Sequence, residues 1–379
     1  MNKGWEQRKL GEVFLYKQGI QVPVEQQYSQ KLPGLIRFIR ISDIVSSNET
    51  PRFINYHGTN LIKPDDLFMV RYGNPGMISM GYSGVIANNL FRLIPKKNIY
   101  TLFFYFLLIF ENKRLNLLVS NTTMPALSFK ALDTFYVNFP EKLSEQKVIG
   151  SLLKKLDSLI TLQQRKLEQL KLLEKAHQQK LFPNSFQEKP LLRILHGDNS
   201  WWNSYIGEVF TERVDKGSSE KLLSVSITDG VYPFDESKRK NNSSDDKHNY
   251  KKVFQNDIAY NSMRLWQGAL GVSKYEGIVS PAYTVLKPLP NQNSIFYEFM
   301  FKNIDMLHIF QRNSQGLTSD TWNLKFNQLQ HIKIKTTNLN SQNKIAKLLI
   351  KIEELKNNES NYYHNLMTLK KYLLQKLFL

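Results

Sequence analysis

An internal repeat constrains the fold of this chain more than any other feature of its sequence. The segment Trp5–Phe14, with the sequence WEQRKLGEVF, returns 196 residues later as WWNSYIGEVF. The same offset brings at least ten further identical residues into register without a gap, beginning with Leu143 and Leu339. Identity at one constant offset over this distance indicates a duplicated structural unit. The chain is therefore predicted to fold as two copies of one unit.

Each copy ends in a segment that is predicted to form one long helix. Residues 144–182 contain no proline and one glycine, and residues 340–379 contain neither. Ser144 and Asn340 are equivalent in the repeat, and both are good N-cap residue types. Apolar residues follow with the seven-residue period of a coiled coil. The positions predicted to form the core of the helix pair are Ile149, Leu152, Leu156, Leu159, Leu170, Ile345, Leu348, Ile352, Leu355 and Leu366.

These two helices are predicted to pair with each other, because a globular core rarely needs two helices of this length. A pseudo-twofold axis crossing the pair would make the helices antiparallel and place one globular domain at each end. The predicted fold class is mixed α/β, with two globular domains in pseudo-twofold repeat separated by two long antiparallel coiled-coil helices. The predicted boundaries are 1–141 and 184–338 for the domains, and 142–183 and 339–379 for the helices.

Matched segments in the two copies predict the interior of the globular domains. Strands are expected at Leu35–Ile41 and Leu222–Ile227, and a second pair at 65–73 and 256–261. The apolar run Tyr100–Phe110 is too short to span a bilayer. Its counterpart in the second copy contains charged residues. The run is therefore predicted to be a buried helix.

The composition limits the classes of function. The net charge is +18 and is spread over the whole chain, which favours a polyanionic partner such as DNA or RNA over a merely lysine-rich protein. There is no cysteine, so disulfides, thiolate zinc sites and thiol nucleophiles are excluded. No apolar signal segment is visible at the start of the sequence, and we expect a soluble, cytoplasmic protein.

The sequence contains no recognisable catalytic or metal-binding motif. It lacks a phosphate loop, a Gly-x-Gly-x-x-Gly segment and a His-Glu-x-x-His segment. Its seven histidines are scattered without the spacing of metal ligands. The segment Asn74-Pro75-Gly76 only faintly resembles an adenine methyltransferase motif, and we interpret it as a turn. We therefore predict a non-enzymatic chain without metal or cofactor.

The globular domains do contain loops rich in basic, aromatic and amide side chains. Lysines would mainly neutralise phosphates, whereas arginine, asparagine and glutamine can pair with base edges. For any single residue the alternative is a solvated loop. The residues predicted to bind DNA are Arg37, Arg40, Arg71, Tyr72, Asn74, Asn88, Arg92, Lys238, Arg239, Lys240, Lys251, Asn261, Arg264 and Gln267.

The repeat resembles the specificity (S) subunits of Type I restriction-modification enzymes. The resemblance lies in Trp5 and the motif Leu-Gly-Glu-Val-Phe at 10–14, in their copies from Trp201, and in Leu-x-x-Gln-x-x-Ile at 143–149 and 339–345. It covers the whole chain in the order domain, helix, domain, helix. Two departures are Thr336, which stands where the first copy has Pro140, and Glu353, which stands where the first copy has Asp157.

The resemblance implies a sequence-specific DNA-recognition subunit. Each globular part would be a target-recognition domain for one half of a split target in double-stranded DNA. The helix pair would fix the gap and bind two modification subunits, which are adenine methyltransferases, and two restriction subunits would be further partners. S-adenosylmethionine, ATP and Mg are expected only in those partners, with no cofactor and no catalysis in this chain. The alternative is a stand-alone non-catalytic DNA-binding or scaffold protein that dimerises through its coiled-coil helices.

Overall fold

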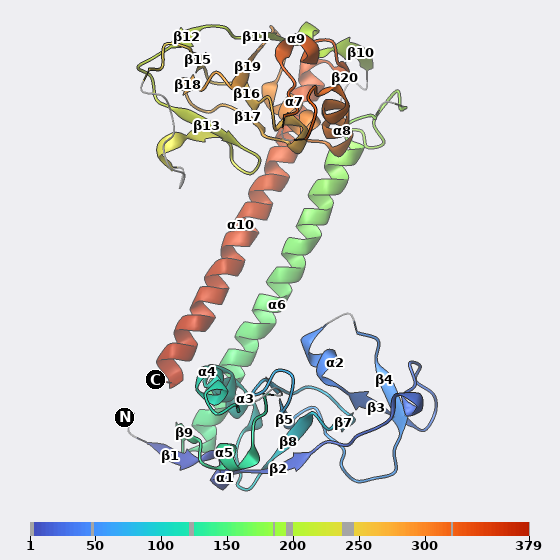
Figure 1. Cartoon of the computed structure of the whole chain (residues 1–379), viewed down its shortest axis with the longest axis vertical. Coiled ribbons are helices and arrows are strands. Elements are labelled where there is room, and N and C mark those ends of the chain that lie inside the picture. The colour runs from blue at the N-terminus through green and yellow to red at the C-terminus, as the bar shows by residue number, and fades with distance from the viewer. Residues whose placement is uncertain are drawn as a thin grey trace. The chain divides into compact units, whose positions relative to one another are not determined.

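Two units of similar construction make up the chain. Unit 1 comprises residues 1–164 and 361–379, and unit 2 comprises residues 165–360. The computed structural model describes residues 4–46, 49–120, 125–184, 186–194, 200–236, 246–319 and 321–378. Each unit contains one globular α/β domain and a part of both long helices, which are α6 (Leu143–Lys180) and α10 (Leu339–Phe378) (Figure 1).

The globular domain of unit 1 contains three small sheets. The largest has the strand order β2-β8-β5-β6, the second has the order β4-β3-β7, and β1 pairs with β9. The elements are β1 (Trp5–Lys9), α1 (Leu10–Val13), β2 (Phe14–Gln18), η1 (Val24–Gln26), β3 (Leu35–Ile39), α2 (Ile41–Val45), β4 (Arg52–Asn55), β5 (Leu67–Val70), β6 (Ile78–Ser79), β7 (Val85–Ile86), β8 (Leu90–Pro95), α3 (Thr101–Phe110), α4 (Asn112–Asn116), α5 (Phe129–Asp133) and β9 (Tyr136–Pro140).

The domain of unit 2 repeats two of these sheets and differs in the rest, which are a sheet of order β12-β15-β18 and the pair β13-β14. The sheet β11-β19-β16-β17 corresponds to β2-β8-β5-β6, and the pair β10-β20 corresponds to β1-β9. The elements are β10 (Trp201–Tyr205), η2 (Ile206–Glu208), β11 (Phe210–Glu212), β12 (Lys216–Gly217), β13 (Leu223–Ser226), β14 (Gly230–Pro233), η3 (Phe234–Glu236), β15 (Tyr250–Val253), β16 (Ile258–Asn261), η4 (Leu265–Gln267), β17 (Leu270–Val272), β18 (Gly277–Val279), β19 (Tyr283–Pro288), α7 (Ser294–Phe301), α8 (Ile304–Asn313), α9 (Phe326–Leu329) and β20 (Lys333–Thr337).

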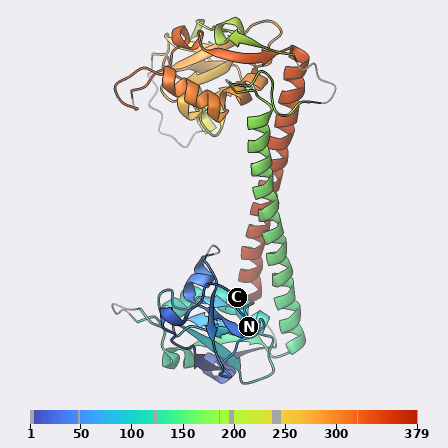
Figure 2. The ribbon, with the colours of Figure 1, turned by 90° about the vertical axis from the view of Figure 1, so that its right-hand side faces the viewer.

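The predicted fold class is confirmed. Both domains are mixed α/β, and α6 packs antiparallel against α10 within each unit (Figure 1 and Figure 2). The apolar run beginning at Tyr100 forms the buried helix α3, as predicted. The strand predicted over Leu35–Ile41 ends at Ile39, because α2 begins at Ile41. Within the described residues no helix is long and apolar enough to cross a membrane.

The Leu-Gly-Glu-Val-Phe motif forms a buried corner in unit 1. Leu10, Val13 and Phe14 are buried, and the backbone N–H of Leu10 donates to the carbonyl of Phe135 at 2.7 Å. A Cβ on Gly11 would lie 2.9 Å from the Cα of Asp133. Glycine is therefore required there for the close approach of α1 to α5, and the equivalent glycine of unit 2 is similarly confined against Gln330.

Matched glutamines join the start of each long helix to its domain. In unit 1 Gln146 accepts the backbone N–H of Tyr100 and donates to the carbonyl of Pro140, both at 2.9 Å. In unit 2 Gln342 accepts the N–H of Asn293 at 2.9 Å and donates to the carbonyl of Thr337 at 2.8 Å. Both glutamines are buried, so each pair of hydrogen bonds satisfies polar groups that water does not reach.

The buried positions of α6 and α10 differ in part from the positions predicted to form the core of the helix pair. Ile149, Leu156, Ile345, Ile352 and Leu366 are buried, and Leu170 is half-buried. The prediction is wrong for four leucines on the outer side of the helices. Their exposed fractions are 46% for Leu152, 49% for Leu159, 37% for Leu348 and 41% for Leu355.

The reason for this error is a local ambiguity in the sequence. Leu152 is followed by Leu153 and Leu159 by Ile160, and in both pairs the second residue is the buried one. A seven-residue period allows the three-four and the four-three order equally, because both place apolar residues along one stripe. The four-three order runs from Ile149 through Leu153 and Leu156 to Ile160: the first two pack into the core of the domain, and the last two pack with Leu366 of α10.

Candidate nucleic-acid interface

The predicted DNA-binding residues of unit 1 lie in two groups, and the first is at the end of β5. Arg71 and Tyr72 follow this strand directly. The N–H of Arg71 donates to the carbonyl of Asn89 at 2.8 Å, which brings the loop before β8, with Asn88, beside them. Asn88 and Asn74 are exposed. The structure therefore brings a guanidinium, a phenol ring and exposed amides together at one edge of the sheet.

The side chain of Arg71 is held by its neighbours. Its Nη1 donates to Oε1 of Gln18 at 2.8 Å. Its guanidinium lies 4.9 Å from the ring centroid of Tyr72 and 4.8 Å from that of Phe129, on which Tyr16 stacks. Burial raises the pKa of Tyr16 well above its usual range, so this hydroxyl stays protonated. Arg71 therefore stabilises the loop through these contacts and also carries a positive charge at the edge of the sheet.

Sequence reasoning missed three residues of this group. Gln18, Asn60 and Phe129 come from three separate segments, and only the fold places them around Arg71. The Nδ2 of Asn60 donates to the carbonyl of Gln18 at 3.2 Å, whereas its buried Oδ1 has no hydrogen-bond partner. No local sequence signal distinguishes these residues from other polar or aromatic side chains.

The second group of unit 1 is tied into ion pairs. Arg37 Nη2 lies 2.6 Å from Oδ1 of Asp43, and Arg40 Nε lies 3.0 Å from Oδ2 of the same carboxylate. Arg92 pairs with Asp66 at 2.7 Å. These guanidiniums stabilise the turns that carry the paired carboxylates. To contact DNA, each arginine would have to leave its carboxylate or bind a phosphate or base in addition to it.

Unit 2 has an equivalent edge at the end of β16. Asn261 closes the strand, and the loop that follows carries Arg264, Trp266 and Gln267. Trp266 packs edge-on against Trp322 at a centroid distance of 5.3 Å. Gly268 has φ +87°, so a residue with a side chain would strain the turn that ends η4. The predicted residues Asn261, Arg264 and Gln267 lie close together at the end of β16.

Hydrogen bonds show which residues of the two edges correspond. The carbonyl of Arg71 accepts the N–H of Leu127 at 3.1 Å, and the carbonyl of Ser262 accepts the N–H of Leu324 at 2.9 Å. Arg71 thus corresponds to Ser262, which contacts the carbonyl of Ala282 through its hydroxyl at 2.9 Å. The two edges share a backbone arrangement and differ in chemistry.

The remaining predicted residues of unit 2 do not join this group. Lys251 pairs with Glu212 at 3.0 Å. Arg213, which the sequence analysis did not select, binds Asp257 through Nε and Nη2 at 2.6 and 3.0 Å. Lys238, Arg239 and Lys240 lie outside the described residues.

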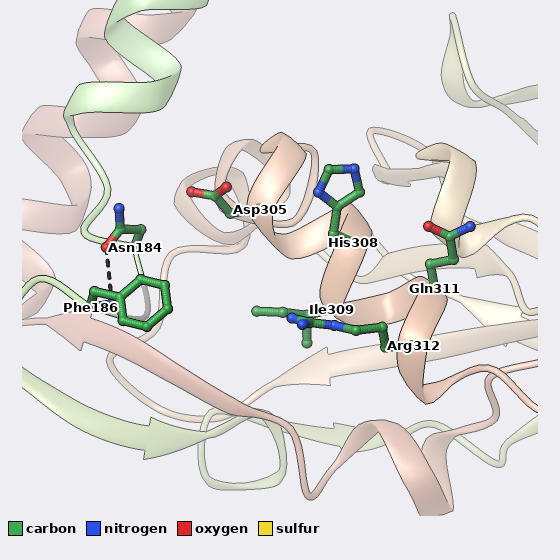
Figure 3. Close-up of a pocket in the computed structure, with 7 residues that line it drawn as sticks. All are labelled: Asn184, Phe186, Asp305, His308, Ile309, Gln311 and Arg312. Carbon is green, nitrogen blue, oxygen red and sulfur yellow. Dashed lines mark hydrogen bonds between the residues drawn. The ribbon is translucent and has the colours of Figure 1, made fainter.

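A surface hollow of about 370 Å³ lies beside α8 in unit 2 (Figure 3). The residues that line it are Asn184, Phe186, Asp305, His308, Ile309, Gln311 and Arg312. The N–H of Phe186 donates to Oδ1 of Asn184 at 3.0 Å on one side of it. Among the described residues no group of three or more His, Cys, Asp or Glu side chains could hold a metal ion.

An exposed row of identical leucines runs along each long helix. We call it the outer stripe, and it consists of Leu152, Leu159, Leu173, Leu348, Leu355 and Leu369, all of which are exposed. The members match at the offset of 196 residues and recur on one helix face at multiples of seven residues. Exposed apolar side chains in a regular row are unusual for a surface that faces only water.

Comparison with known proteins relates this chain to one family. A family model described as the Type I restriction modification DNA specificity domain matches residues 2–172. The S subunit of a Type I restriction-modification system from M. genitalium superposes with a TM-score of 0.64 at 14% identity, covering 100% of this chain and 97% of that one.

A second solved structure has the same arrangement of elements. It comes from work on complex assembly and conformational transition of a type I R-M system, and it superposes with a TM-score of 0.53 at 14% identity. The superposition covers 100% of this chain and 98% of that one. At such identities the likeness of these structures concerns the fold.

Proposed function

From the match of residues 2–172 to the Type I restriction modification DNA specificity domain, we propose that the chain belongs to this family and that its two domains recognise the two halves of a split DNA target. Family proteins of this kind recognise DNA and do not catalyse. In this proposal the domain of unit 1 contacts one half-site and the domain of unit 2 contacts the other. The edges at the ends of β5 and β16 face the bases.

One observation carries this proposal: the two copies keep the residues that build the domain and differ in those at the edge. Gln146 and Gln342 make the same pair of bonds to their domains. Arg71, in contrast, is replaced by Ser262 at the equivalent backbone position. Base recognition depends on side-chain donors and acceptors, so unlike edges would select unlike half-sites.

We further propose that the helix pair fixes the gap between the half-sites and binds two modification subunits. The outer stripe supports the second part, because its leucines repeat in both copies although each is 37–49% exposed. Two copies of one apolar row would bind two copies of one partner. Two domains joined by a spacer bind tightly only when the half-sites match its length.

The chemistry would then belong to the partners. In this proposal the modification subunits bind S-adenosylmethionine and methylate adenine, and restriction subunits use ATP and Mg. This chain would contribute the position of the complex on double-stranded DNA. Its +18 charge supplies affinity for phosphates of any sequence.

The test is selection from random-sequence duplex DNA by the purified chain together with its modification subunit. The proposal expects two conserved blocks of unlike sequence separated by a gap of fixed length. One uninterrupted block, recovered by the chain alone, would instead support a stand-alone DNA-binding protein. Enrichment of no sequence under low salt, where phosphate contacts are strongest, would contradict recognition of bases.

A further inference from the structure

Arg71 differs from the other three arginines of unit 1 that are predicted to bind DNA. Arg37, Arg40 and Arg92 each pair with a carboxylate, at 2.6, 3.0 and 2.7 Å. Arg71 has no carboxylate partner among the described residues, and its guanidinium donates instead to the neutral amide of Gln18. Arg71 can therefore bind an acceptor outside the protein without breaking an ion pair.

The side-chain amide of Gln18 has one orientation that satisfies both of its neighbours. Its Oε1 accepts an N–H of Arg71 Nη1 at 2.8 Å, and its Nε2 donates to the carbonyl oxygen of Asn88. A guanidinium only donates and a carbonyl oxygen only accepts, so a flipped amide would lose both bonds. Gln18 therefore holds one terminal nitrogen of the guanidinium at the end of β2.

The contacts of Arg71 leave part of its guanidinium unoccupied. Its Nε is buried and has no partner, so a ligand does not reach it while the side chain keeps this position. Nη1 donates one of its two N–H groups to Gln18, and Nη2 has no acceptor in the part of the chain that the structure describes. The rings of Tyr72 and Phe129, with centroids 4.9 and 4.8 Å from Cζ, limit its rotation. A ligand would therefore meet the terminal nitrogens of a guanidinium whose plane is held.

Unit 2 lacks both members of this pair. Val214 stands 196 residues after Gln18 and is 70% exposed. Ser262 takes the backbone position of Arg71, and its hydroxyl donates to the carbonyl of Ala282. The same kind of sheet edge forms in unit 2 without either side chain, so the fold does not depend on the pair of Gln18 and Arg71.

Two terminal nitrogens that only donate match one base edge better than the others. In the major groove guanine presents two acceptors, O6 and N7, whereas adenine places an amino donor beside its N7. Cytosine presents an amino donor, and thymine presents a single acceptor. Both terminal nitrogens therefore find acceptors on guanine alone. A phosphate also accepts such bonds, but it binds the point charge of a lysine as well and gains less from a guanidinium plane that is held.

We propose that Arg71 recognises one guanine in the half-site of the first domain, and that Gln18 is a positioning residue that orients its guanidinium. The proposal rests on the proposed function, because it assigns base contact to the edge at the end of β5. Gln18 itself does not touch the base. With Val214 and Ser262 at the equivalent positions, the second domain does not recognise guanine in this way.

The test measures binding of the chain with its modification subunit to single-base variants of the selected target. Replacement of one guanine by another base should weaken binding about 10–100-fold, and 7-deazaguanine, which lacks the N7 acceptor, should weaken it about tenfold. In Arg71→Lys, which keeps the charge but not the planar fork, both differences should fall below about threefold. If Arg71→Lys keeps every base preference and binds all sequences more weakly, Arg71 contacts a phosphate and the proposal is overturned.

A cycle of variants tests the role of Gln18. Gln18→Val introduces the residue that unit 2 carries, so the fold should be kept, and the preference for guanine should fall about fivefold. In the Arg71→Lys chain the same change should have no further effect on this preference, because Gln18 acts only through Arg71. Equal losses in both backgrounds would overturn the positioning role. Gln7→Val, at an exposed position of β1, is the matched control and should bind as the unaltered chain does.

Failure of the proposed function gives a different result from failure of this inference. If the unaltered chain with its partner selects no split target, both are overturned. A split target in which 7-deazaguanine replaces every guanine of either half without loss overturns the inference alone. This last measurement uses the unaltered chain, so it decides the outcome even where Arg71→Lys does not fold.

Discussion

At the scale of single residues, identity between the two copies separates side chains that build the domains from those at the proposed recognition edges. Gln146 and Gln342 are identical in type and in their bonds, and each holds the start of a long helix to its domain. Gln342 lies in a polar cluster in which Tyr297 donates to Gln292 at 2.6 Å, and burial raises the pKa of Tyr297 to about 12. Residues at the loop edges share no such identity.

Replacement of Gln342 by leucine should lower the free energy of unfolding by about 1–3 kcal/mol, because a buried N–H of Asn293 and a carbonyl of Thr337 would lose their partner. Thermal unfolding followed by circular dichroism measures the effect. The matched control is Gln169→Leu at an exposed position of α6, where little change is expected. Equal effects of the two variants would remove the structural role given to Gln342.

Asn88→Ala and Gln267→Ala should each alter one half-site only. Both positions belong to the predicted recognition edges, Asn88 beside β8 and Gln267 in η4. Loss of an amide that pairs with a base is expected to cost about 1–3 kcal/mol of discrimination at one base pair. Binding to a panel of single-base variants of the target shows this, and a uniform loss over both halves would contradict assignment of one domain to each half.

The sequence predicted candidate residues for the proposed recognition edges but not the hydrogen-bond or ion-pair partner of each side chain. Arg37, Arg40 and Arg92 were selected for their charge, and the structure pairs all three with carboxylates. Whether an arginine faces a ligand or an internal acid depends on which segments the fold brings together. The same limit explains why Gln18 and Asn60, which lie far apart in sequence, escaped selection.

At the scale of elements, each long helix has two apolar rows with different roles. The inner row, with Leu156 and Leu366, packs α6 on α10. The outer stripe, with Leu159 and Leu355, remains exposed. The sequence predicted both helices from their lack of breakers, yet it merged the two rows into one, since both obey a seven-residue period.

Replacement of Leu159 and Leu355 by aspartate should abolish binding of the modification subunit without unfolding the chain, because both side chains are exposed and belong to the outer stripe. Co-purification and circular dichroism measure the two effects. Leu15→Asp, an exposed leucine on β2, serves as the control that should keep the partner. Retention of the partner by the doubly substituted chain would rule out the outer stripe as its docking surface.

Removal of one heptad from both helices, residues 162–168 and 358–364, should shorten the gap and leave both half-sites unchanged. Seven residues span about 10.5 Å of helix, which corresponds to about three base pairs. The deletion keeps the heptad register and leaves the pairs of Glu174 with Lys356 and of Asp157 with Lys370 in place. Target mapping by DNA selection that returns altered half-site bases would show that the helices do more than set a distance.

At the scale of the whole molecule, duplication gives two domains that are built alike but carry different side chains at their loop edges. The repeat, the buried motif at 10–14 and the two helices were all predictable, because hydrophobic burial and close packing dictate them. The proposed recognition surfaces stay predictions at the level of regions, because base preference depends on side-chain geometry.

The most direct test of the account is to map adenine methylation in a host that expresses this chain with its modification subunit. The account predicts methylation within a split motif that has two unlike halves and a gap of fixed length. Long-read sequencing detects the modified adenines directly. Methylation at a continuous or palindromic motif would contradict the claim that two unlike domains of one chain recognise the two halves of the target.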